Sequence, residues 1–243
     1  MVGIGALAAT GFVDDRHGNL SPAARLAIQV SAGGLQTWER PLAGPLSALI
    51  WPGVVNVVNF MDGINGITGS SVAVWGLATL SAGRRAQDPT LQTLGAVTAG
   101  AGLGFLPWNA PKAHLFLGDV GSYLFGGLIA AGVVHAAQQP AVRWRVAAPL
   151  LPYVADAGMT LARRAARGKP LTEAHRDHAY QQLVDECGLS HETVAAMHAL
   201  TATTTAAVAA SPLPSPIRAL MTLAATAGYV TSPMWLRDRK RLR

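Results

Sequence analysis

A succession of long apolar runs, separated by short polar breaks, is the feature that most constrains how this chain folds. Half of the 243 residues are apolar and only 13% are charged. The runs 67–82 and 91–108 contain no Asp, Glu, Lys or Arg. A helix of a water-soluble bundle needs a polar face, and the segments 71–80 and 120–134 offer almost none. The pattern therefore predicts an all-α fold, a polytopic integral membrane helix bundle.

The polar breaks predict how often the chain crosses the membrane. After the opening stretch 1–13, the apolar runs are 26–38, 42–58, 67–82, 91–108, 123–137, 146–153, 194–210 and 217–235. Several of them are shorter than the roughly 20 residues of a perpendicular helix. We expect about seven full spans plus a partial first one, all within a single domain that covers residues 1–243.

Carboxylates stand at the ends of these runs. Two crossings separate each acidic position from the next, so we expect Asp14, Asp15, Asp62, Asp119 and Asp156 on one side of the bilayer or close to it. A charge is tolerated at the edge of a bilayer but costs several kcal/mol near its middle. The spacing therefore predicts a polar site at one membrane surface.

The basic residues indicate which surface this is. The chain has 19 Lys and Arg against 13 Asp and Glu, a net charge of +6. Because positive charge marks the cytoplasmic side, we expect the following segments there: loops near 14–25, 62–66, 109–122 and 162–192, and the basic tail 237–243. The pairs Arg84-Arg85 and Arg143/Arg145 fall on the opposite side, against this trend. No basic face with interleaved aromatic residues is present, so no nucleic acid partner is expected.

The first polar motif is the pair Asp14-Asp15. Adjacent carboxylates at a helix end can bind Mg²⁺, and one of them can accept a proton. The alternative is a polar helix terminus followed by Ser21-Pro22, which would serve as the N-cap and first residue of the next helix.

The second motif contains Asn56, Asn59, Asp62 and Gly63. If the helix continues through it, Asn56, Asn59 and Gly63 share one face, and glycine allows a ligand to approach the backbone closely. A glycine-rich turn is the alternative. It explains Asp62-Gly63 but leaves the two amides unexplained.

Two further motifs complete the set. Asp119 lies between two glycines where an apolar helix opens, which suits a metal–phosphate site beside a helix N-terminus; the alternative is a simple N-cap. His175, Arg176 and His178 occupy a basic loop, and His with Arg can bind a diphosphate. A solvated loop is the alternative there.

Taken in order, these motifs resemble one family. The motifs are Asp14-Asp15, Asn59-Phe60-Met61-Asp62-Gly63, Phe116-Leu117-Gly118-Asp119-Val120-Gly121-Ser122 and His175-Arg176-Asp177-His178. They are similar to those of the polyprenyl-phosphate N-acetylhexosamine-1-phosphate transferases, glycosyltransferase family 4, and most similar to the branch that initiates O-antigen synthesis. The resemblance runs from Gly11 to about Leu183. Members of the family carry about two more spans before the Asp pair, so the chain is expected to be short at its N-terminus.

The resemblance implies which reaction the protein catalyses and in which membrane it lies. Undecaprenyl phosphate would attack the β-phosphorus of a UDP-N-acetylhexosamine or a UDP-acetamido-deoxyhexose, which gives undecaprenyl-diphospho-sugar and UMP. The enzyme would be Mg²⁺-dependent, with Mn²⁺ as the alternative ion, and would lie in the bacterial cytoplasmic (inner) membrane with its active site facing the cytoplasm. Which UDP-sugar it uses stays open.

The resemblance also implies roles for the residues. Asp119 and Asp15 would bind the metal, and Asp14 and Asp15 would position or deprotonate the lipid phosphate, with the choice of base left open. The residues implied in substrate binding are Asn56, Asn59, Asp62, Gly63, Asn65, His175, Arg176 and His178.

Expected partners are undecaprenyl phosphate, a UDP-sugar and the lipid bilayer, with a second copy of the chain, in a homodimer, as a further candidate. Two other hypotheses remain, an inactive membrane remnant of such an enzyme and a small-molecule transporter. Transport sites usually lie near the middle of the bilayer, whereas these acids cluster at one edge.

Overall fold

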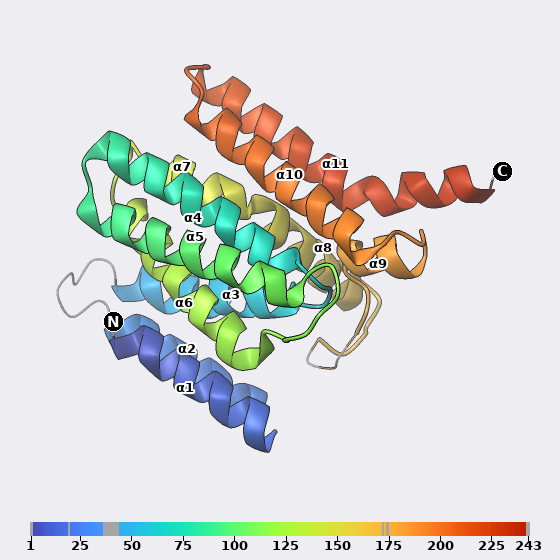
Figure 1. Cartoon of the computed structure of the whole chain (residues 1–243), viewed down its shortest axis with the longest axis horizontal. Helices are drawn as coiled ribbons and strands as arrows, with labels where there is room; N and C mark the ends of the chain where they lie inside the picture. The colour runs from blue at the N-terminus through green and yellow to red at the C-terminus, as the bar shows by residue number, and fades with distance from the viewer. Residues whose placement is uncertain (1, 19, 36–43, 172, 174, 242–243) are drawn as a thin grey trace.

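The computed structural model describes residues 2–18, 20–35, 44–171, 173 and 175–241. Within these residues all regular structure is helical, which confirms the all-α prediction (Figure 1). The helices are α1 (Val2–His17), α2 (Pro22–Leu35), α3 (Gly44–Phe60), α4 (Ile67–Ala86), α5 (Pro89–Asn109), α6 (Gly118–Ala137), α7 (Arg143–Ala147), the 3₁₀ turn η2 (Ala148–Leu150), α8 (Leu151–Ala166), α9 (Ala179–Asp185), α10 (His191–Ala210) and α11 (Ser215–Arg241).

The observed helix boundaries follow the predicted breaks closely. Ser21 accepts a hydrogen bond at its Oγ from the Ala24 N–H (3.2 Å) and Pro22 opens α2, as expected for an N-cap and first residue. The predicted run 146–153 differs, because it is divided among α7, η2 and the start of α8. Pro149 and Pro152 lack the N–H that a continuous helix would need, and each lies in the first turn of a new element.

In the part of the chain that the structure describes, two helices are long and apolar enough to cross a membrane, α6 and α10. A shorter apolar stretch, Ser47–Phe60, lies in α3. The count of about seven spans stays a prediction. The predicted break 39–41 and the last two residues of the predicted tail, 242–243, lie outside the described residues.

The centre of the bundle is α6, which packs against α1 on one side and α3 on another. The helices α4 and α5 form a closely packed pair, and α10 lies between α4 and α11 (Figure 1). Trp51 and Trp75 are fully buried in the core. The Trp75 indole also donates to the Val146 carbonyl at 3.0 Å, which ties α4 to α7.

The end of α6 near His135 is held by a polar cluster. Asp88, in the turn between α4 and α5, accepts hydrogen bonds from His135 Nε2 at 2.8 Å and Gln139 Nε2 at 2.7 Å. It also caps α5 by accepting from the Leu91 N–H at 3.0 Å. His135 therefore serves packing at this end, about 24 Å along α6 from Asp119.

Glycine allows α4 and α5 to approach closely. A Cβ atom on Gly95 would collide with the backbone of Leu80 in α4, and one on Gly76 would collide with the backbone of Ala99 in α5. Small residues at such crossings let helices pack closely within a membrane.

We predict that Gly95→Ala lowers the thermal unfolding midpoint in detergent, because the added methyl group forces the two helices apart at a cost of about 1–3 kcal/mol. Gly100→Ala is the matched control, since the same helix has open space at that position and alanine favours the helix by about 1 kcal/mol. Equal midpoints for the two variants would contradict the packing explanation.

Candidate functional site

One end of the bundle gathers the predicted acids and amides from three helices. Asp14 and Asp15 close α1, Asn59 lies in the last turn of α3, and Asp119 opens α6. Asp15 and Asp119 are 104 residues apart in the sequence, yet they are joined by a hydrogen bond. The structure thus brings Asp14, Asp15 and Asp119, three of the five acids that span counting groups, together at one end of the bundle.

Asp15 caps α6 from a different helix. Its Oδ1 accepts from the Asp119 N–H at 2.8 Å and its Oδ2 from the Val120 N–H at 2.9 Å. The preceding Gly118 has a φ of +65°, and a side chain there would press on the Asp15 carboxylate. The first N–H groups of a helix have no acceptor within the helix and carry partial positive charge. The Asp15 carboxylate supplies that acceptor and a compensating negative charge. Asp119 is therefore not the N-cap of its own helix, and its side chain is left for other contacts.

The Asp119 carboxylate is held by an amide and a guanidinium. Asn59 Nδ2 donates to Asp119 Oδ1 at 2.6 Å, and Arg25 Nη1 lies 3.9 Å from Asp119 Oδ2. The same Arg25 nitrogen donates to Oδ2 of the buried Asp14 at 3.0 Å. Two acids from different helices thus share one arginine.

Arg25 was not singled out in the sequence as a site residue. The available signal was its position, one turn into the helix that follows the acid pair and the Ser21-Pro22 start. Only the fold shows that this turn faces both Asp14 and Asp119.

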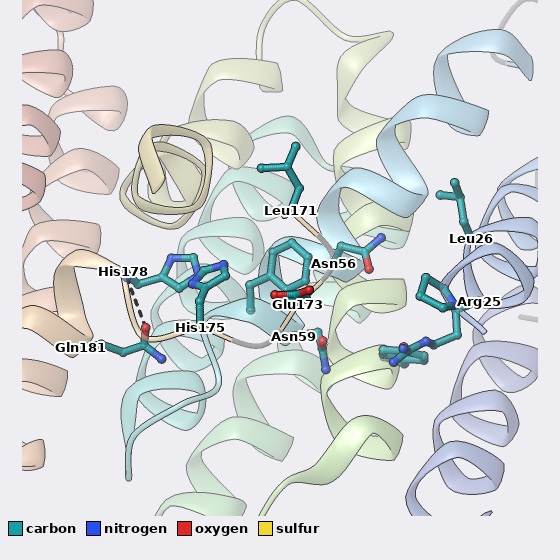
Figure 2. A pocket seen from close by; sticks show the side chains of 12 residues that line it. Arg25, Leu26, Asn56, Asn59, Leu171, Glu173, His175, His178 and Gln181 are labelled. Atoms are coloured by element: carbon teal, nitrogen blue, oxygen red, sulfur yellow. Dashed lines mark hydrogen bonds between the residues drawn. The ribbon is translucent and has the colours of Figure 1, made fainter. Parts of the chain in front are cut away.

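A cavity of about 490 Å³ opens beside this cluster. Figure 2 shows Arg25 and Leu26 on one side of it, His175 and His178 on the other, and Asn56 and Asn59 between them. Its volume lies within the range of small-molecule sites, about 300–1,000 Å³. Four of the predicted substrate-binding residues line it: Asn56, Asn59, His175 and His178.

The other residues of the second motif shape a turn. The expectation that Gly63 shares a helical face with Asn56 and Asn59 is wrong, because α3 ends at Phe60. Gly63 instead lies under the Tyr180 hydroxyl, which donates to the Phe60 carbonyl at 3.0 Å. The Asn65 amide donates to the Pro111 carbonyl at 3.2 Å.

Asp156 positions the segment that carries the two histidines of the cavity, His175 and His178. This buried carboxylate accepts from the N–H groups of Ala179 (2.8 Å) and Tyr180 (3.2 Å) and lies 3.3 Å from His178 Nδ1. His175 stacks on His178 with ring centroids 5.0 Å apart. Because a carboxylate oxygen accepts, the hydrogen of this contact lies on His178 Nδ1. Burial, followed by the neighbouring His178 and Arg164, lowers the pKa of His175.

Arg176 lies outside the cavity. Its guanidinium is exposed and makes two hydrogen bonds to Asp185, at 2.8 and 3.0 Å. The arginine that organises this loop is the buried Arg164, which donates to Asp177 and to the Pro170 carbonyl, each at 2.6 Å. The sequence offers no periodic signal that would separate Arg164 from its neighbour Arg163.

The acids fit a magnesium ion in one particular way. Among the described residues no three His, Cys, Asp or Glu side chains converge as a metal cage. Mg²⁺, however, is usually held by one or two carboxylates together with the phosphates of the substrate. Asp119 and Asp14, which share Arg25 beside the cavity, offer those carboxylates. Asp15, predicted as a metal ligand, already accepts a backbone hydrogen bond at each oxygen.

Comparison with known proteins gives a consistent set of relatives. The family model described as "Glycosyl transferase family 4" matches residues 1–137. The similar proteins include phospho-N-acetylmuramoyl-pentapeptide-transferases of Synechococcus elongatus (34% identity over 162 residues, 54% of this chain and 44% of the relative), of a Nostoc species (34% over 151, 50% and 41%) and of Mycobacteroides abscessus (39% over 92, 31% and 26%). The chain thus spans less than half the length of these curated relatives.

Asp62 gives this end of the bundle a pH-dependent stability. Burial and then the nearby Asp119 raise the pKa of Asp62 to about 6, against a hydrogen bond with Thr68 that lowers it. Because the folded pKa exceeds the unfolded one, the folded state loses stability as the pH rises from about 4 through 6. We predict that Asp62→Asn raises the thermal midpoint at pH 8, measured in detergent with EDTA, and that the gain shrinks at pH 5 and is nearly gone at pH 4.

Asp185→Asn is the control of opposite sign. The hydrogen bond from Arg176 lowers the pKa of Asp185, so its contribution to stability is present above pH 4 and fades in more acidic solution. This variant should be equal to or less stable than the parent at pH 8. A gain in stability for both variants, or for neither, would contradict the explanation.

Proposed function

Because the chain belongs to glycosyl transferase family 4, we propose that it transfers a sugar-1-phosphate from a UDP-linked acetamido sugar to undecaprenyl phosphate. The products are undecaprenyl-diphospho-sugar and UMP. The observation that carries the proposal is the position of Asp119, which begins the long apolar helix α6 and lies beside a polar cavity. Such a position allows a lipid-linked phosphate to meet a water-soluble nucleotide.

Charge compensation is the main task of such a site, because both substrates are anions. Phosphoryl transfer depends chiefly on positioning and on electrostatic stabilisation of the phosphates. Arg25 lines the cavity and supplies a guanidinium for a phosphate. Mg²⁺ bound by Asp119 and Asp14 would neutralise the diphosphate and the leaving UMP.

Asp14 is the better candidate to position the lipid phosphate or accept its proton. Asp15 has both oxygens engaged by the start of α6, so using it as a base would weaken the cap that holds Asp119 in place. Asp14 interacts with a side chain, Arg25, which can change partner when a phosphate arrives. We therefore assign Asp14 to the acceptor phosphate and Asp15 to the support of α6.

The rest of the cavity, from its middle to the side that faces Arg25, suits the donor. Asn56 and Asn59 present amides, and His178, held by Asp156, lines the cavity where it can contact the sugar or diphosphate. Exposed apolar side chains next to the site, Phe12, Phe116 and Trp108, suit a membrane surface. We infer that this surface is the cytoplasmic one, since span counting assigns most of the Lys and Arg residues to the same side as the acids.

The relatives provide an alternative candidate for the donor substrate, because their name refers to a phospho-N-acetylmuramoyl-pentapeptide group. The motifs around 59–63 and 175–181 favour the smaller acetamido sugars. Parallel transfer assays with the two candidate donors show which one the protein uses.

We expect membranes that contain the chain to transfer label from a UDP-acetamido sugar to undecaprenyl phosphate, with release of UMP and dependence on Mg²⁺ or Mn²⁺. Asp119→Asn should reduce this transfer about 10²–10³-fold, a loss typical of removing a key electrostatic group, while the thermal midpoint changes little. Absence of labelled lipid with every donor, including the pentapeptide donor, would overturn the proposal.

The assignments of Asp14 and Asp15 predict different phenotypes. Asp14→Asn should abolish transfer with a near-parental thermal midpoint. Asp15→Asn should lower the midpoint, because an amide nitrogen cannot accept a hydrogen bond, and the loss of a cap costs about 0.5–2 kcal/mol. Residual transfer by Asp15→Asn at low temperature supports the assignment, whereas a stable but inactive Asp15→Asn protein would reverse it.

A further inference from the structure

A second cavity, of about 310 Å³, lies between α4 and α10 at the end of the bundle away from the acids. The two helices run side by side in the same direction, from the contact of Ser71 with His198 (2.9 Å) toward Arg85 and Ala210. We call this cavity the α4–α10 groove. On α10 it is lined by Thr203 and by alanines, whose small side chains leave the space between the helices unfilled.

The dimensions of the groove match one leaflet of a bilayer. Along α4 it extends from Val74 to Arg85, which is twelve residues and about 16 Å of helix. The hydrocarbon core of a bilayer is about 30 Å thick, so the groove extends from one headgroup level to near the middle. A third helix, roughly 10 Å wide, does not fit in so small a volume, but a lipid acyl chain does.

Two arginines stand where the headgroup would lie. Arg85 of α4 and Arg145 of α7 both line the groove, and in the described part of the chain neither has a carboxylate partner. The acid nearest to Arg85 in the sequence, Asp88, is engaged by His135, Gln139 and the start of α5. Two guanidiniums without an acidic partner, next to an apolar slot, are suited to a phosphate group.

Arg85 and Arg145 also belong to the pairs of basic residues that lie on the side of the membrane where few positive charges are expected. Arg84-Arg85 and Arg143/Arg145 fall on the side that the positive-inside trend leaves poor in basic residues. One member of each pair faces the groove and the other does not. A bound anion accounts for Arg85 and Arg145 without changing the predicted orientation.

We propose that the α4–α10 groove binds an anionic phospholipid of the leaflet opposite the acidic site, with one acyl chain between α4 and α10 and the phosphate on Arg85 and Arg145. The proposal depends on membrane insertion of the bundle and is independent of sugar-phosphate transfer. Its failure and the failure of the proposed activity are therefore separate results.

The test uses the full chain, purified in detergent and titrated with phosphatidylglycerol or with phosphatidylcholine of the same acyl chains. Binding is read by native mass spectrometry and by the thermal midpoint. We expect phosphatidylglycerol alone to bind at low lipid ratios and to raise the midpoint. Arg85→Gln and Arg145→Gln should each weaken its binding about fivefold, the effect typical of one basic residue at an anionic surface.

Matched controls separate this site from general surface charge. Arg84→Gln and Arg143→Gln remove the neighbouring charges that do not line the groove, and they should leave lipid binding unchanged. Ala207→Leu keeps every charge but fills the groove at an exposed position, so it should reduce binding of phosphatidylglycerol.

Three results would overturn the proposal. The first is equal binding of the two lipids, and the second is an equal loss for all four arginine variants, which indicates diffuse attraction. The third is loss of a concentration-dependent dimer in Ala207→Leu without any effect on lipid, which identifies a second copy of the chain as the occupant.

Discussion

The carboxylate of Asp15 holds the candidate site together. From the end of α1 it accepts hydrogen bonds from the Asp119 and Val120 N–H groups in the first turn of α6. Glycine at Gly11 and Gly118 lets the two helices come close enough for this contact. The neighbouring Asp14 is thereby brought to the same Arg25 that faces Asp119. The geometry of the acids, and the cavity beside them, depends on this one cap between helices.

The molecule has two ends with different chemistry. One end carries the acids, the amides and the 490 Å³ cavity. The other carries the Asp88 cluster and the arginines of the α4–α10 groove. The apolar length of α6 separates them, since Asp119 opens this helix and His135 lies near its close. This polarity fits the two anion sites that we propose, one at each end of the bundle.

The cavity also has two walls of different origin. Arg25, Asn56, Asn59 and Tyr123 lie within residues 1–137, the part matched by the family model. His175, His178 and Gln181 come from the loop and helix beyond that range. The matched wall supports the proposed phosphate chemistry. The second wall is where we place contacts that select the donor sugar.

The all-α fold, most of the helix boundaries and the grouping of Asp14, Asp15 and Asp119 follow from the sequence, because apolar runs, proline positions and span counting are local or additive properties. Asp14 and Asp15 look equivalent in the sequence, yet one meets Arg25 and the other meets the backbone of α6. Likewise, Arg176 matched a motif but points to the surface, whereas Arg25 had no motif and lies in the site. Only the folded chain reveals these contacts, because adjacent residues of a helix point about 100° apart and their partners come from distant parts of the chain.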